Sequence, residues 1–282
     1  MNRQFAMVGA SCLLLLAIGG GVAWRGLSTS QAEVESAADD GDGERLPVPP
    51  VPPRIAEGPD YERCLNMLVP DPAGAASFAE TWQAKGGGDG ATHCLALSKI
   101  ALGNPADGAA MLETLAASSH APNLARATLY GQATQAWLMT GDEQHAFDAA
   151  TQALALSPDD ADLLIDRATA ASNLDRYQDA IGDLTHALDT DPRRADALTL
   201  RGAAWRHIGE LDHAQDDIDR ALTLDPDNAD ALLERGIIRQ RHNDRAGART
   251  DWERAVKLAP DTPTADLAQQ NLALLEAGPD QR

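Results

Sequence analysis

Four prolines recur at a fixed interval of 34 residues, and this interval constrains the fold more than any other feature of the chain. Pro158, Pro192, Pro226 and Pro260 each end an alanine- and leucine-rich stretch, and each has an aspartate beside it. A period of this length indicates stacked helical hairpins, because one hairpin cannot bury its apolar face alone. We therefore expect four units, at residues 127–160, 161–194, 195–228 and 229–262.

Each unit has the pattern of two amphipathic helices joined by a tight turn. The turn positions hold residue types that tolerate left-handed backbone at a helix C-terminus, namely Gly141, Asp175, Gly209 and Asn243. The second helix of each unit carries two alanines seven residues apart, which share one face; these are Ala146, Ala153, Ala180, Ala187, Ala214, Ala221, Ala248 and Ala255. Aromatic residues make up only 4% of the chain, which favours helix–helix packing over a β-sheet.

Charged residues follow the same period. Arginines share one slot of the first helix and aspartates share one slot of the second, sixteen residues later, as Arg167 and Asp183, Arg201 and Asp217, and Arg235 and Asp251. The first unit has Ala133 and Ala149 in these slots, so both charges are missing together. We therefore expect an ion pair between the two helices of each of the last three hairpins. The alternative is that these arginines bind an acidic ligand.

These turn, alanine and terminal-proline slots, together with small residues in the first helices at Ala168, Gly202 and Gly236, resemble those of the tetratricopeptide repeat family. The resemblance covers residues 127–262 and implies an all-α, right-handed superhelical solenoid. Residues 91–122 look like a degenerate extra repeat, within a helical N-terminal region at 60–126. Residues 263–282 would hold a terminal capping helix and tail, with Leu267, Leu272 and Leu275 packed on the last unit. Such a cap covers the apolar side that the final repeat would otherwise expose.

In this family, partners bind in a groove lined by the first helices. The resemblance therefore places a partner-binding groove on Gln132, Gln135, Ile165, Thr169, Ser172, Thr199, Ala203, Arg206, Leu233, Ile237 and Gln240. The lysines and asparagines with which some members bind a terminal carboxylate are missing from this set. A mixed apolar and polar groove favours an extended peptide or a helix of a partner protein.

Three further helices are expected before the repeats. Asp71-Pro72 is a typical N-cap and first-turn proline and would open a helix that runs to about residue 84. Helices at about 91–102 and 105–117 would follow the glycine-rich segment 86–90. We interpret that segment as a loop and not as a phosphate-binding motif, because no strand precedes it and Lys85 stands before the glycines.

The first 25 residues are expected to form a membrane anchor or a signal segment. Phe5 to Trp24 carry no charge, and twenty helical residues span the roughly 30 Å hydrocarbon layer. Ser30-Gln31-Ala32 offers a cleavage site for a secretory signal, and a lipoprotein role of Cys12 is the weaker alternative. We expect a single-pass protein of the inner membrane with its repeats in the periplasm or outside; cleavage would instead release it into the periplasm.

Residues 26–59 are expected to be a linker. Its first part is acidic, and the proline run at 46–53 favours an extended polyproline II spacer. A ligand for an aromatic groove is the alternative for this run.

Export would also influence whether the cysteines form a disulfide. Cys64 and Cys94 are the pair outside the apolar segment, and two lone cysteines in an oxidising compartment favour a disulfide. Buried free thiols are the alternative. A zinc site would need two more ligands; His93 is adjacent, but a fourth group at ligand spacing is missing.

Composition and motifs favour a binding protein over an enzyme. The net charge of −20 argues against nucleic acid and against anionic lipid surfaces. The seven histidines are scattered without a metal-ligand pattern, and we expect no cofactor, metal or small-molecule substrate. The sequence thus predicts a non-catalytic scaffold for protein partners; an accessory factor for the assembly or maturation of exported proteins and a cell-wall-associated protein are the alternatives.

Overall fold

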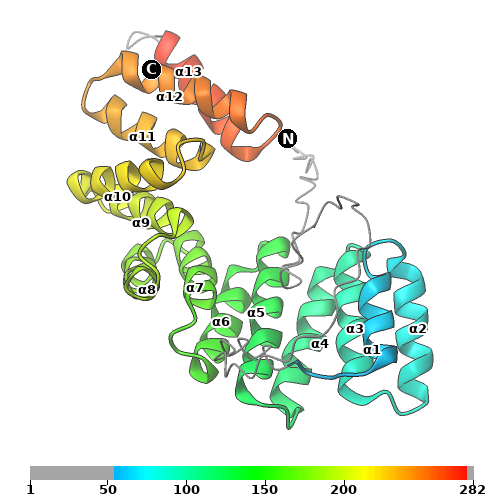
Figure 1. Ribbon diagram of the computed structural model, residues 1–282. Helices are drawn as coiled ribbons and strands as arrows, with labels where there is room; N and C mark the ends of the chain where they lie inside the picture. The colour runs from blue at the N-terminus through cyan, green and yellow to red at the C-terminus, as the bar shows by residue number, and fades with distance from the viewer. Residues whose placement is uncertain (1–53, 278–282) are drawn as a thin grey trace, which may run out of the picture. The chain divides into compact units, whose positions relative to one another are not determined.

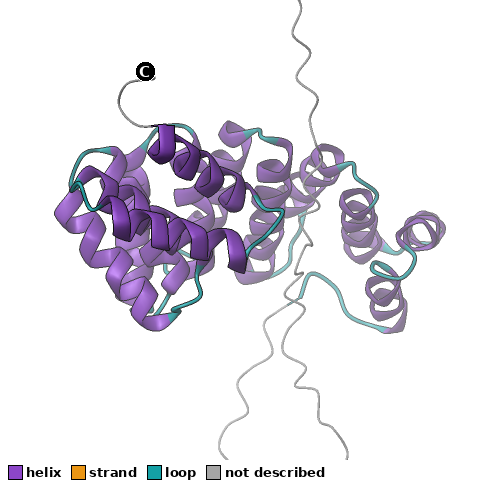
Figure 2. Ribbon diagram, turned by 90° about the horizontal axis from the view of Figure 1, so that it is seen from above, coloured by secondary structure: helices purple, strands orange, loops and turns teal. Residues whose placement is uncertain are grey.

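The computed structural model describes residues 54–277, and this part of the chain consists of α-helices joined by short loops, without a β-strand (Figures 1 and 2). The helices before the repeats are α1 (Pro59–Met67), α2 (Pro72–Ala84), α3 (Gly88–Ala101) and α4 (Pro105–Ser118). The helices that follow are α5 (Asn123–Thr140), α6 (Glu143–Leu156), α7 (Ala161–Asn173), α8 (Tyr177–Thr190), α9 (Ala195–His207), α10 (Leu211–Leu224), α11 (Ala229–Arg241), α12 (Arg245–Leu258) and α13 (Pro263–Ala277). The predicted all-α hairpin solenoid is confirmed.

The turns inside the hairpins adopt the backbone that the sequence predicts. Gly141, Asp175, Gly209 and Asn243 all have positive φ, between 58° and 90°. In this conformation the chain leaves the first helix and re-enters the second within a few residues. Each second helix then ends two residues before a repeat proline, at Leu156, Thr190, Leu224 and Leu258, because a proline disfavours helical backbone in the residue before it.

Alanine makes the hairpins tight. The eight periodic alanines of the second helices are fully buried, each with 0% exposure. Facing them, glycines on the first helices let the partner helix come close. A Cβ on Gly202 would lie 2.8 Å from Ile218, and one on Gly236 would lie 2.6 Å from Cδ1 of Trp252. The buried Trp252 indole also donates a hydrogen bond to the carbonyl of Leu233 at 3.1 Å.

The N-terminal helices differ from the sequence prediction at the glycine-rich segment. Helix α3 begins at Gly88, so the expected loop is wrong for residues 88–90. Within this segment, Gly86 and Gly88 have positive φ, whereas Gly87 and Gly90 lie against Trp82. A Cβ on either would approach the indole to 2.8 Å. These glycines therefore allow α2 and α3 to pack closely instead of forming a long loop.

Two other boundaries also differ. The first repeat helix, α5, starts at Asn123, one turn before the expected residue 127. In α13, Ala265, Ala268 and Leu275 are buried and Leu272 is partly buried, but Leu267 is 50% exposed. The prediction that Leu267 packs on the last unit is therefore wrong, because the buried face of α13 runs through residues 265, 268, 272 and 275.

The expected N-terminal anchor or signal at 1–25 and most of the expected linker at 26–59 lie outside the described residues. Within 54–277, none of the helices is both long enough and apolar enough to cross a membrane. The described chain starts shortly before α1, and Ile55 already packs against the core.

Candidate partner-binding surface

The first helices of the hairpins form one layer. Helix α7 contacts α5 and α9, and α11 contacts α9 and α13, so these helices lie next to one another although a second helix separates each pair in sequence (Figure 1). We call α5, α7, α9 and α11 the first-helix layer. A partner that binds along this layer would touch several repeats at once.

Three of the predicted groove residues are not available to a partner. Ile165, Thr199 and Leu233 are only 9%, 6% and 6% exposed, so the prediction that they line an open groove is wrong. The equivalent residue of the first unit, Gly131, explains why: a Cβ there would meet the side chain of Leu163 on the next first helix. This slot therefore packs one first helix against the next.

The other eight predicted residues keep some exposure. Gln135 is exposed, and Gln132, Thr169, Ser172, Ala203, Arg206, Ile237 and Gln240 are partly buried. Several are already engaged with neighbours. Gln132 accepts a hydrogen bond from Nε2 of His93 at 2.8 Å, and Gln135 donates to Asp166 at 3.4 Å. The groove assignment for these eight stays a prediction.

Polar side chains bridge consecutive first helices, and the sequence analysis predicts only Arg206 among those that follow. Arg206 of α9 donates to Glu234 of α11 at 2.5 and 3.1 Å, and both side chains are largely buried. Arg194 joins Asp162 of α7 to Asp196 of α9, each at 2.7 Å. The 34-residue spacing places Gln132, Asp166 and Glu234 in one slot, and this signal could have found Glu234.

Asp166 is a carboxyl group of this layer that forms no ion pair within residues 54–277 and accepts one hydrogen bond, from Gln135. Burial raises the pKa of its carboxyl to about 7, and the neighbouring Asp162 and Asp160 also raise it, whereas Gln135 and Arg194 lower it. Arg194 itself pairs with Asp162 and Asp196 instead. The layer therefore holds a carboxyl group that changes its charge near neutral pH.

The arginine and aspartate slots meet inside the last three hairpins. Arg167 donates to Asp183 at 2.6 and 2.7 Å, and Arg201 donates to Asp217 at 2.7 and 2.8 Å. Arg235 donates to Asp251 at 2.7 and 2.9 Å. Each pair is bidentate, which makes it stronger and more specific than a single contact. The Asp183 and Asp251 carboxylates raise the pKa of Arg167 and Arg235, respectively.

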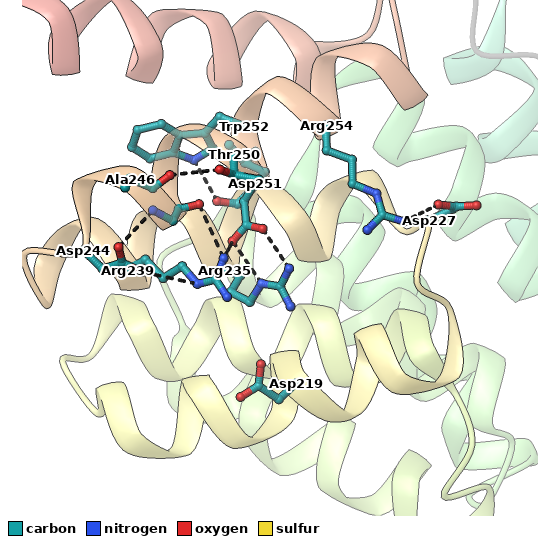
Figure 3. Close-up of polar contacts among 12 residues, drawn as sticks. Asp219, Asp227, Arg235, Arg239, Asp244, Ala246, Thr250, Asp251, Trp252 and Arg254 are labelled. Carbon is teal, nitrogen blue, oxygen red and sulfur yellow. Dashed lines mark hydrogen bonds and ion pairs between the residues drawn. The ribbon is translucent and has the colours of Figure 1, made fainter.

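Asp251 accepts from a second arginine as well. Arg239 donates to it at 2.7 Å, so two guanidinium groups converge on a carboxylate that is 2% exposed (Figure 3). Arg254, on the same helix as Asp251, instead pairs with Asp227 at the surface. The sequence predicts Arg235 in this cluster but not Arg239, because Arg239 has no counterpart in the other repeats.

The two cysteines lie in the N-terminal helices. A disulfide joins Cys64 of α1 to Cys94 of α3, and both residues are fully buried. Beside it, Oη of Tyr61 and Nδ1 of His93 form a hydrogen bond of 2.6 Å. Burial lowers the pKa of His93 to about 4, so the ring is neutral near pH 7. In the described range 54–277, the structure contains no group of three His, Cys, Asp or Glu side chains able to hold a metal ion.

Stacked helical hairpins with small residues at fixed slots define a helical-repeat protein of the solenoid class. The sequence profile described as tetratricopeptide repeat matches residues 165–229 and 208–263. Residues 165–263 therefore consist of tetratricopeptide repeats.

Solved structures share this fold at low sequence identity. The crystal structure of MamA is 17% identical, with a TM-score of 0.51, and the match covers 64% of this chain and 97% of that one. A MamA RS-1 double mutant is 18% identical, with a TM-score of 0.50 over 72% of this chain and 96% of that one. The Cut9–Hcn1 hetero-tetramer of the APC/C is 18% identical, with a TM-score of 0.57; the match covers 76% of this chain but only 42% of that chain. A search of curated proteins found no match.

Proposed function

We propose that this chain is a non-catalytic scaffold that binds an extended peptide or a helix of a partner protein along the first-helix layer. The observation that carries the proposal is the continuous contact of α5, α7, α9 and α11, which puts polar and apolar side chains of four repeats on one surface. Repeat solenoids use such extended surfaces for binding. The eight groove residues that keep some exposure are the proposed contacts.

The ion pairs have a supporting role in this proposal. Arg167, Arg201 and Arg235 each bind an aspartate of their own hairpin, so they fix the angle between the two helices. This favours the structural role over the alternative in which these arginines hold an acidic ligand.

We further propose that the repeats lie on the exported side of a membrane, attached through the N-terminal segment. The uncharged stretch from Phe5 to Trp24 supports the attachment. The disulfide between Cys64 and Cys94 supports export, because disulfides persist in oxidising compartments and are rare in the cytosol. Fractionation of cells that express the full chain, followed by thiol labelling of the denatured protein without reductant, tests both: membrane association and unlabelled Cys64 and Cys94 are expected.

Cross-linking in intact cells tests the groove. The full chain would be compared with a triple variant, Gln135→Arg, Ser172→Arg and Gln240→Arg, whose changes all lie in the first-helix layer. The matched control carries Gln144→Arg, Gln152→Arg and Gln178→Arg, three exposed glutamines of the second helices α6 and α8. A captured protein that disappears only with the first variant supports the proposal. Loss of the same protein with both variants, or with neither, contradicts it.

A further inference from the structure

A cavity of about 680 Å³ lies between the second helices α8 and α10 and the first helix α9. Thr185 of α8 and Arg201 and Trp205 of α9 line it, and α10 contributes a longer row that includes His213, Asp216 and Asp217. The groove proposed above does not include this cavity.

The charges around the cavity are not balanced among themselves. Two guanidinium groups line it, those of Arg201 and Arg220, and both donate to Asp217, at 2.7 and 3.4 Å. Asp219 accepts from Gln215 at 2.7 Å. Asp216 has neither a hydrogen bond nor an ion pair with another side chain in the range 54–277. Three carboxylates against two guanidinium groups leave the cavity net negative.

An aromatic wall lines the same cavity as the unpaired carboxylate. Trp205 stacks on His213, with ring centroids 4.8 Å apart and an angle of 26° between the planes. The stack holds the indole in place on α9 while Asp216 projects from α10, one turn after His213. An indole face beside a carboxylate suits a guanidinium or ammonium group, which gains from both the ring quadrupole and the ion pair.

The first repeat contains a matched arrangement, two repeats earlier in the chain. Trp137 and His145 stack with the same 4.8 Å separation, and Asp148 takes the place of Asp216. There, however, Glu113 of α4 lies close to the stacked pair. Burial raises the pKa of its carboxyl, while Trp137 and His145 lower it. Glu113 and Thr185 stand at the same point of their helices, eight residues after Pro105 and Tyr177. Thr185 is shorter than Glu113, so it leaves space beside Trp205.

We propose that the cavity between α8, α9 and α10 is a second binding site, which takes an arginine or lysine side chain of a protein partner. The cation would stack on Trp205 and pair with Asp216. The net charge of −20 would favour the approach of a basic segment. None of the residues that line this site is among the eight proposed groove contacts, so a partner could be held there independently of the groove.

Titration of the full chain, labelled with ¹⁵N at tryptophan, tests this site. The probe is the peptide acetyl-Gly-Ser-Arg-Ser-Gly-amide, and its citrulline analogue is the neutral control of nearly the same shape. The indole signal of Trp205, identified with a Trp205→Phe variant, should shift with the arginine peptide, whereas the Trp137 signal should not. Asp216→Asn should weaken binding about three- to tenfold, in the range of a partly exposed ion pair.

The matched control is Asp148→Asn, which changes the equivalent aspartate of the first repeat and should leave the affinity unchanged. Asp216 is exposed, so its substitution is not expected to disturb folding. An equal response to the citrulline peptide would overturn the proposal, since the charge would then not be recognised. Equal weakening by Asp148→Asn and Asp216→Asn would also overturn it, because only general attraction to an acidic protein would remain.

Discussion

Single residues differ in how far the sequence alone could place them. The 34-residue repeat places Arg167, Arg201 and Arg235 in one slot and their aspartates in another. Both charges are missing together from the first unit, which identifies them as partners. The repeat pattern could not show that Ile165 is buried while Thr169 keeps some exposure, since both lie on the same helix only four residues apart. Their burial depends on how the next first helix packs, and that contact joins residues far apart in sequence.

Asp251 should be the most sensitive member of the ion-pair series. Arg235 and Arg239 each donate to its buried carboxylate at 2.7 Å, whereas the second arginine on Asp217, Arg220, lies at 3.4 Å. Asp251→Ala would therefore remove the shortest contact of both guanidinium groups. We expect a loss of about 3 kcal/mol in the free energy of unfolding. Asp227→Ala, which breaks the exposed pair with Arg254, should cost at most about 1 kcal/mol. Urea denaturation of both variants measures the difference, and equal costs would contradict a special role of the buried cluster.

Asp166 should make stability depend on pH. Its folded-state pKa of about 7 lies above the value of about 3.9 in an unfolded chain. The unfolded state therefore ionises first, and stability falls as the pH rises from about 4 to 7 and then levels off. Asp166→Asn should be more stable than the parent at pH 8, by about 1–2 kcal/mol, and the difference should vanish near pH 4.

The control for this prediction is Asp189→Asn, an exposed carboxylate on α8. Thermal melts at several pH values would show whether the two variants differ. The same pH profile in both would mean that Asp166 is not the group responsible.

At the scale of helices, starts and turns follow from local chemistry and were largely predictable. Asp71 caps α2 through the amide of Gly74, and the four hairpin turns have left-handed residues where the sequence offers them. The start of α3 was not predictable from local chemistry. Its glycines read as a loop, but Trp82 covers them, and that contact appears only once α2 and α3 are packed.

Two glycines within helices should respond in opposite ways to the same substitution. Gly236→Ala would press a methyl group against the buried Trp252, and overpacking of this kind costs about 1–3 kcal/mol. Gly182 of α8 has nothing within 4 Å of the Cβ position, so Gly182→Ala should stabilise the chain by about 0.5–1 kcal/mol through backbone entropy. Denaturant unfolding of both variants separates the effect of close helix packing from that of helix propensity. A lower free energy of unfolding at both sites would contradict this account of Gly236.

On the scale of the whole molecule, the periodicity of the sequence predicts more of the helix arrangement than its composition does. The 34-residue interval predicts which helices are neighbours, because every hairpin must bury its apolar face on the next. It does not predict where a partner binds, since the open surface is what remains after all hairpins have packed. The cavity beside Trp205 shows this limit: its space depends on Thr185, which lies in the preceding hairpin.

The stability of the last repeat should depend on α13, although α13 has exposed leucines. Ala265, Ala268 and Leu275 are buried against the last hairpin, and α13 contacts both α11 and α12. Because repeats are coupled mainly to their nearest neighbours, removal of residues 263–282 should lower hydrogen-exchange protection in α11 and α12 and leave α5 to α8 nearly unchanged. Removal of residues 278–282 alone is the control and should change neither. A loss of protection that spreads evenly over all helices would instead mean that the described chain unfolds as one cooperative unit, and that α13 stabilises the whole solenoid rather than its last repeat.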